Sequence, residues 1–250
     1  MTCTLLKRIV PLLLVVVAVG ATNQKPHPST TEPLEYQNCT SYNYPGRHAA
    51  ILKAKDALNP QIVMIGDSIT HHWGGVPSDR LKNGEKVLKS DLAKYRTLNL
   101  GFGHDRTQHA IWRLRNGELD GLHPDWVVIH IGTNNTSDGN TAAEIMAGIQ
   151  AICEEVQKRT PKARIVLMSI LPHEKGPKSR RRILIDETNT LIAAYAAAQK
   201  FVHLDIGKEF LDEQGAVKGS LMPDACHPNA DGYRIWAKAL NAIFDGAAKR

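Results

Sequence analysis

Five short apolar runs, separated by amphipathic stretches, restrict what this chain of 250 residues can fold into. They span residues 62–65, 97–100, 127–131, 165–170 and 202–204. The runs are continuous rather than alternating, which is typical of strands covered on both faces. We therefore predict five buried strands.

Amphipathic stretches between the runs predict helices with one buried face. The clearest places Ile145, Ile149 and Cys153 on one side of a helix, and two others cover residues 184–195 and 233–244. Strands alternating with helices indicate parallel βαβ units. The expected fold is α/β, with a five-stranded parallel sheet and helices on both faces, in one domain over residues 47–250.

The N-terminus has the pattern of a secretory signal peptide. Lys7 and Arg8 precede an apolar run over residues 9–19, and small residues follow it. We predict a signal peptide over residues 1–21 and a secreted or periplasmic protein; the alternative is an uncleaved anchor, although the run is short for a membrane span. Residues 22–46 are rich in Pro, Thr, Ser and Asn, and predict a linker or N-terminal arm.

Charge and aromatic content do not favour a nucleic-acid partner. The formal charge is +6, and without the basic residues of the signal it falls to +4. Charges are scattered, and aromatic residues, 6% of the chain, do not interleave with a basic run, so no nucleic-acid partner is expected. No stable membrane insertion is expected after signal cleavage.

The cysteines do not form a metal or disulfide framework. Cys3 lies in the predicted signal, which leaves Cys39, Cys153 and Cys226, an odd number without CxxC spacing. Cys153 is expected to be a buried thiol. If the chain is exported, a disulfide between Cys39 and Cys226 is an alternative to two free thiols.

Polar segments after the strands are expected to meet at one edge of the sheet, where sites of such folds form. Ser68 follows the first strand, and a serine there needs an adjacent base to act as a nucleophile. His227, three residues after Asp224, suits that role because a carboxylate at this spacing can reach imidazole Nδ1 and leave Nε2 for Ser68. Pro228 suits the first turn of the last helix.

Four sequence blocks occur in the order found in a known family: Gly66-Asp67-Ser68-Ile69, Asn99-Leu100-Gly101, Gly132-Thr133-Asn134-Asn135 and Asp224-Ala225-Cys226-His227. They resemble the blocks of the SGNH (GDSL) hydrolases. The stretch Trp112-Arg113-Leu114-Arg115-Asn116-Gly117-Glu118-Leu119 further resembles the catalytic subunits of platelet-activating-factor acetylhydrolase, as does Leu171-Pro172 with Gly176-Pro177.

The resemblance implies a three-layer, flavodoxin-like sandwich and a serine that attacks an ester without a metal or other cofactor. It implies the triad Ser68, Asp224 and His227. It also implies an oxyanion hole formed by the backbone N–H groups of Ser68 and His104 and the side chain of Asn134.

This chain departs from the family pattern at His104, where members commonly have glycine. The backbone N–H is kept, but a left-handed backbone would cost more there without glycine. The His104 imidazole either lines the acyl pocket and favours acetyl groups, or points to solvent.

Other polar residues have structural interpretations. Asp105, with Gln108 three residues later, suggests a helix capping box, and Asp67 is expected to brace the nucleophile turn. His71, His72 and His130 lack the ordered motifs of metallophosphatases, so no metal site is expected; His72 either faces the cleft or is exposed.

The expected function is a serine esterase that hydrolyses small acyl, mainly acetyl, esters of a small molecule or a carbohydrate. Alternatives are a lipase or lysophospholipase for longer acyl chains, or a catalytically silent carbohydrate-binding protein. The basic segment 175–182 is expected to be solvated surface, or else to attract anionic substrates through Arg181 and Arg182. The oligomeric state is not indicated.

Overall fold

The sheet has five parallel strands in the order β2-β1-β3-β4-β5. A computed structural model describes residues 29–36, 39–78 and 80–248 of the chain. The strands are β1 (Ile62–Gly66), β2 (Thr97–Gly101), β3 (Trp126–His130), β4 (Arg164–Met168) and β5 (Val202–Leu204). This order is that of the flavodoxin-like fold, so the predicted fold class is confirmed.

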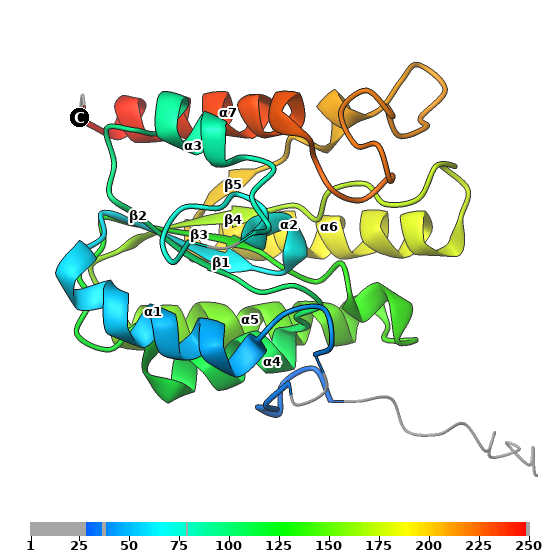
Figure 1. Cartoon of the computed structure of the whole chain (residues 1–250). Coiled ribbons are helices and arrows are strands. Elements are labelled where there is room, and N and C mark those ends of the chain that lie inside the picture. Colours follow the sequence, from blue (N-terminus) through cyan, green and yellow to red (C-terminus); the bar gives the residue numbers. More distant parts are fainter. Residues whose placement is uncertain (1–28, 37–38, 79, 249–250) are drawn as a thin grey trace, which may run out of the picture.

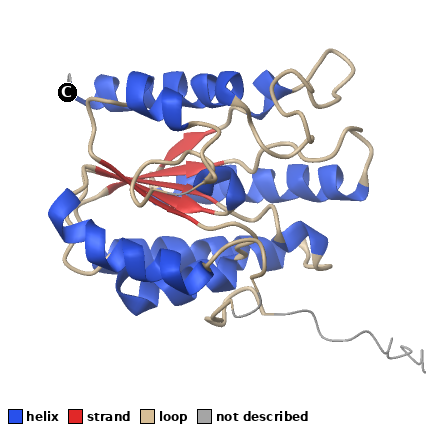
Figure 2. Cartoon of the chain, in the orientation of Figure 1, coloured by secondary structure: helices blue, strands red, loops and turns tan. Residues whose placement is uncertain are grey.

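Helices cover both faces of the sheet (Figures 1 and 2). One face packs against α1 (Tyr44–Leu58), α4 (Thr107–Arg113), α5 (Ala142–Arg159) and α6 (Arg180–Gln199). The other face packs against α3 (Glu85–Asp91) and α7 (Ala230–Ala248). Short elements are α2 (Ser68–His71), the π-helical turn η1 (Leu114–Glu118) and the 3₁₀ turns η2 (Asn135–Ser137) and η3 (Gly207–Phe210).

The strands divide the core into two halves. In β1, Val63 and Ile65 face α1, α4, α5 and α6, whereas Ile62 and Met64 face α3 and α7. Both sets are buried because side chains alternate across a strand that is covered on two sides. This explains the continuous apolar runs of the sequence.

The carboxyl ends of β2, β1 and β3, which are neighbours in the sheet, are level. Gly66 of β1 pairs with Gly101 of β2 and with His130 of β3. The loops after these strands therefore begin side by side, which places the candidate site at this edge of the sheet.

The described part of the predicted N-terminal arm lies on the domain. The hydroxyl of Thr30 donates to Glu144 O at 2.6 Å, and Leu34 N donates to Gln108 O at 3.1 Å. The helix α1 begins at Tyr44, before the expected domain start at residue 47. The predicted signal peptide lies outside the described residues. Within the described ranges, no helix is both long and apolar enough to cross a membrane.

Candidate active site

The turn that carries the expected nucleophile, Ser68, joins β1 to α2. The Asp67 carboxylate accepts a hydrogen bond from Ile69 N at 3.0 Å and caps the helix, as a brace of this turn should. A Cβ atom on Gly66 would lie 2.3 Å from His130 O, so only glycine fits against β3 at this point. The half-buried Ser68 is thereby held at the edge of the sheet.

Ser68, His227 and Asp224 meet in a hydrogen-bonded chain, although 159 positions separate the first two. The Ser68 hydroxyl lies 2.8 Å from His227 Nε2, and His227 Nδ1 lies 2.6 Å from Asp224 Oδ2. The carboxylate fixes the tautomer that carries its proton on Nδ1, so Nε2 is the acceptor for the serine proton. This arrangement can deprotonate Ser68 during attack on a carbonyl.

The Asp224 carboxylate is held by its own turn. Its Oδ1 accepts hydrogen bonds from His227 N at 2.7 Å and Cys226 N at 3.0 Å. Burial raises the pKa of Asp224, but the hydrogen bonds from His227 and Cys226 outweigh it and lower the pKa to about 2. The carboxylate is therefore ionised at neutral pH.

The expected oxyanion donors lie on the loops after β2 and β3. His104 is exposed and has φ 65°, the left-handed backbone conformation that favours glycine. Asn134 Nδ2 donates to Asp105 O at 2.8 Å, which ties the two loops together. A side-chain amide has two N–H groups, so this bond leaves one for a ligand.

The capping box expected from Asp105 and Gln108 is wrong. The N-cap of α4 is Arg106, and the Asp105 side chain is buried in the protein.

Asp105 belongs to a buried ionic network next to His104. Its carboxylate accepts hydrogen bonds from Arg113 Nε and the Tyr44 hydroxyl, both at 2.9 Å. Arg113 also pairs with Glu118, whose other oxygen is 2.9 Å from His48 Nδ1. The Trp-Arg-Leu-Arg-Asn-Gly-Glu segment thus supplies the ion pairs that hold Asp105.

Further expectations concern the basic segment 175–182 and the cysteines. Arg182 is buried, so the basic segment is not uniformly solvated surface. Cys39, Cys153 and Cys226 are all free, so the Cys39–Cys226 bridge is not formed, and Cys153 is buried as expected.

The extra histidines have separate environments. His130 is buried in the core, where desolvation lowers its pKa to about 4. His72 lies on the ring of His227, the cleft-facing alternative of the sequence analysis. Among the described residues, no group of three or more His, Cys, Asp or Glu side chains is arranged to hold a metal ion.

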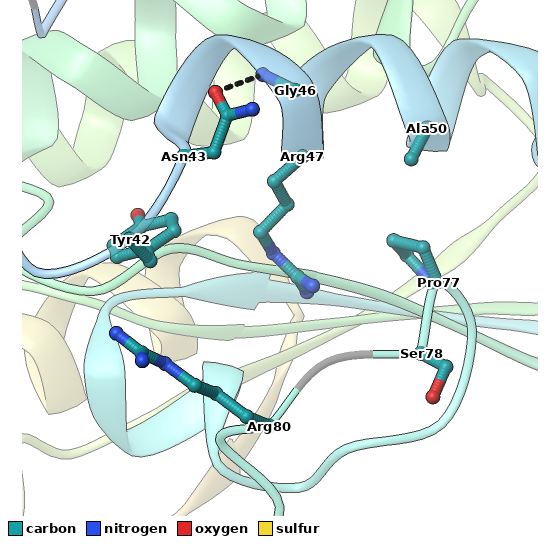
Figure 3. A pocket seen from close by; sticks show the side chains of 8 residues that line it. All are labelled: Tyr42, Asn43, Gly46, Arg47, Ala50, Pro77, Ser78 and Arg80. Atoms are coloured by element: carbon teal, nitrogen blue, oxygen red, sulfur yellow. Dashed lines mark hydrogen bonds between the residues drawn. The ribbon is translucent and has the colours of Figure 1, made fainter.

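A cavity of about 520 Å³ lies apart from the triad, between α1 and the loop that contains Pro77. Figure 3 shows Arg47 extending from α1 toward this loop. The guanidinium donates to Gly101 O and Asn99 O, each at 2.9 Å, so it fastens α1 to β2. None of the triad residues lines this cavity.

Comparisons with known proteins identify the family of the chain. The model of the GDSL-like lipase/acylhydrolase family matches residues 64–235. The human platelet-activating factor acetylhydrolase IB subunit alpha1 is 33% identical over 198 residues, covering 79% of this chain and 80% of that protein. The rat alpha2 subunit is 30% identical over 194 residues, covering 78% and 80%.

Solved structures share the fold. A GDSL-like lipase from Bacteroides thetaiotaomicron has a TM-score of 0.64 at 21% identity, covering 82% of this chain and 96% of that one. The acetylxylan esterase from Geobacillus stearothermophilus has a TM-score of 0.55 at 19% identity, covering 73% and 92%. On the family match and the similarity to the curated relatives, the chain belongs to the GDSL-like lipase/acylhydrolase family and is a carboxylic ester hydrolase.

Proposed function

We propose that this protein is a serine esterase that removes small acyl groups, chiefly acetyl, through a Ser68–His227–Asp224 triad. The observation that carries the proposal is the chain of contacts of 2.8 Å from Ser68 to His227 and 2.6 Å from His227 to Asp224. Nucleophile, base and orienting carboxylate stand in the order that acyl transfer requires.

The reaction proceeds in two halves. Ser68 Oγ attacks the ester carbonyl while His227 Nε2 takes the hydroxyl proton, and His227 then protonates the leaving alcohol. Water, deprotonated by His227, releases the acyl group from Ser68 in the second half. The N–H groups of Ser68 and His104, with the Asn134 amide, stabilise the negative charge on the carbonyl oxygen in both halves.

The preference for acetyl groups has support in relatives of this chain. The curated relatives that match over four fifths of their length are named acetylhydrolases, and one structural neighbour is an acetylxylan esterase. An exported acetylesterase would meet acetylated polysaccharides, so a carbohydrate ester is the proposed natural substrate. The charged, apolar and small residues at positions 7–21 are the basis for placing the protein outside the cytoplasm.

A series of p-nitrophenyl esters tests this proposal. We expect kcat/KM to be highest for acetate and to fall for butyrate and octanoate. Ser68→Ala and His227→Ala should each lose most of the activity, with the fold checked by circular dichroism, because triad members act as a unit. A maximum at octanoate would favour the lipase alternative. Substantial activity of Ser68→Ala would remove the triad assignment itself.

A further inference from the structure

Arg181, the second residue of α6, lies across the loop that carries Asn134. Its Nε donates to the Thr136 hydroxyl at 3.0 Å, and its Nη2 donates to Thr133 O at 3.3 Å and to the Ser137 hydroxyl at 2.5 Å. These acceptors lie on both sides of Asn134 in the sequence. One guanidinium therefore holds the loop before and after the expected oxyanion donor.

The same guanidinium also faces the turn that carries His227. Arg181 Nη1 lies 3.8 Å from Glu174 Oε1, and Glu174 N donates to Ala225 O at 3.1 Å. Glu174 and Ala225 have φ of 65° and 57°. Such conformations persist in non-glycine residues only where the surroundings enforce them. Arg181 thus connects the Asn134 loop to the Asp224–His227 turn.

The donors of Arg181 are directed at the protein rather than at solvent. Its side chain is 23% exposed, Nε and Nη2 bind neutral oxygens, and Nη1 faces a carboxylate. A planar guanidinium can make several such bonds in fixed directions, which a lysine ammonium cannot reproduce. This arrangement is suited to fixing a loop and less suited to recruiting an anionic substrate.

We propose that Arg181 is a positioning residue that sets the Asn134 amide against the Ser68–His227 pair. The inference rests on the proposed triad mechanism. A donor of the oxyanion site stabilises the transition state only when it is aimed correctly, and a displacement of about 1 Å can cost about a hundredfold in rate. Loss of Arg181 should therefore act on kcat.

The test compares Arg181→Lys and Arg181→Gln with Arg180→Gln, which removes a neighbouring exposed charge from the same helix. The substrates are phenyl acetate and the anionic 4-carboxyphenyl acetate. Both Arg181 variants should lower kcat about ten- to a hundredfold for both esters, with KM within about twofold. Phenylboronic acid, a mimic of the tetrahedral adduct, should bind to each Arg181 variant more weakly by about the factor by which kcat falls. Arg180→Gln should keep the wild-type constants.

Two results would overturn the inference. One is wild-type kcat in Arg181→Lys, because charge alone would then suffice. The other is a rise in KM confined to the anionic ester, because Arg181 would then be a substrate-binding cation. If the Arg181 variants do not fold, Thr136→Val is the second test. It removes the acceptor of Arg181 Nε together with the bond from the Thr136 hydroxyl to Thr133 O, and should lower kcat severalfold. Unchanged kcat in Thr136→Val also contradicts the inference. Active Ser68→Ala would instead contradict the triad mechanism, which separates the two failures.

Discussion

The imidazole of His72 lies nearly parallel to that of His227, with ring centroids 4.6 Å apart and 21° between the ring planes. Asn83 Nδ2 lies 3.2 Å from His72 Nδ1 and 3.4 Å from Pro228 O. The face of His227 is thus supported by a ring that Asn83 connects to Pro228, two residues before α7 begins. This contact limits rotation of the imidazole between Ser68 and Asp224.

Replacing His72 should reveal this support. His72→Ala should lower kcat about tenfold, whereas His72→Phe should stay within about threefold because it keeps a flat ring against His227. The exposed His123 supplies the control His123→Ala, with no expected effect. The measurement is kcat for p-nitrophenyl acetate at one pH. Equal losses in the Ala and Phe variants would show that stacking is not the relevant contact.

The left-handed backbone of His104 predicts that glycine is tolerated there. His104→Gly should keep its activity on acetate and raise Tm by about 1–3 °C, because glycine adopts φ 65° without strain. Since the residue is exposed, the chain-length profile over acetyl, butyryl and octanoyl esters should not change. Better use of long esters would instead assign the imidazole to the acyl pocket. A loss on acetate of about a hundredfold would implicate the ring in catalysis.

Asp67 predicts a specific dependence of stability on pH. Burial raises the pKa of its carboxyl to about 7, while hydrogen bonding from Ile69 N opposes the rise. Because the folded-state pKa exceeds the unfolded value, the folded state binds the extra proton, and wild-type stability falls as pH rises from about 4 to about 7. Asp67→Asn keeps the helix cap but cannot ionise.

The difference in free energy of unfolding between Asp67→Asn and the wild type should therefore rise, in favour of the variant, by on the order of a few kcal/mol between pH 4 and pH 8. Urea unfolding at several pH values measures this difference, and other titrating groups cancel in the comparison. A difference that does not change with pH would show that Asp67 is ionised throughout.

The buried network behind His104 predicts a large loss of stability when one member is removed. Glu118→Gln leaves Arg113 with less compensation for its charge, and should lower the free energy of unfolding by on the order of 3 kcal/mol, or Tm by about 10 °C. The exposed pair of Asp231 and Arg234 is the control, and Asp231→Asn should change stability by less than about 1 kcal/mol. Equal effects of the two variants would contradict the importance of burial.

The sequence was sufficient to predict the sheet and the group of residues at its edge. The strands begin and end within two residues of the expected runs, because burial on both faces leaves an uninterrupted apolar signal. Ser68, Asp224 and His227 could be brought together because strand ends and the last helix converge in this topology.

The contacts of Asp105, Arg181 and His72 could not be predicted, because they depend on how distant elements pack. The capping pattern at Asp105 was misleading because the partners of its carboxylate, Tyr44 and Arg113, lie 61 and eight positions away. In the sequence, Arg181 is one of several charges in a basic segment. The acceptors of its guanidinium become visible only where α6 approaches the loop that carries Asn134. His72 was ambiguous because a residue four positions after Ser68 can point either to the cleft or to solvent.

The central claim is that Ser68 carries the acyl group, and a stoichiometric label tests it most directly. The protein is treated with diisopropyl fluorophosphate, and intact mass and peptide mapping locate the adduct. One diisopropylphosphoryl group on Ser68, complete loss of esterase activity and no labelling of Ser68→Ala are the predicted results. An adduct on another residue, or wild-type hydrolysis by the labelled protein, would contradict the account.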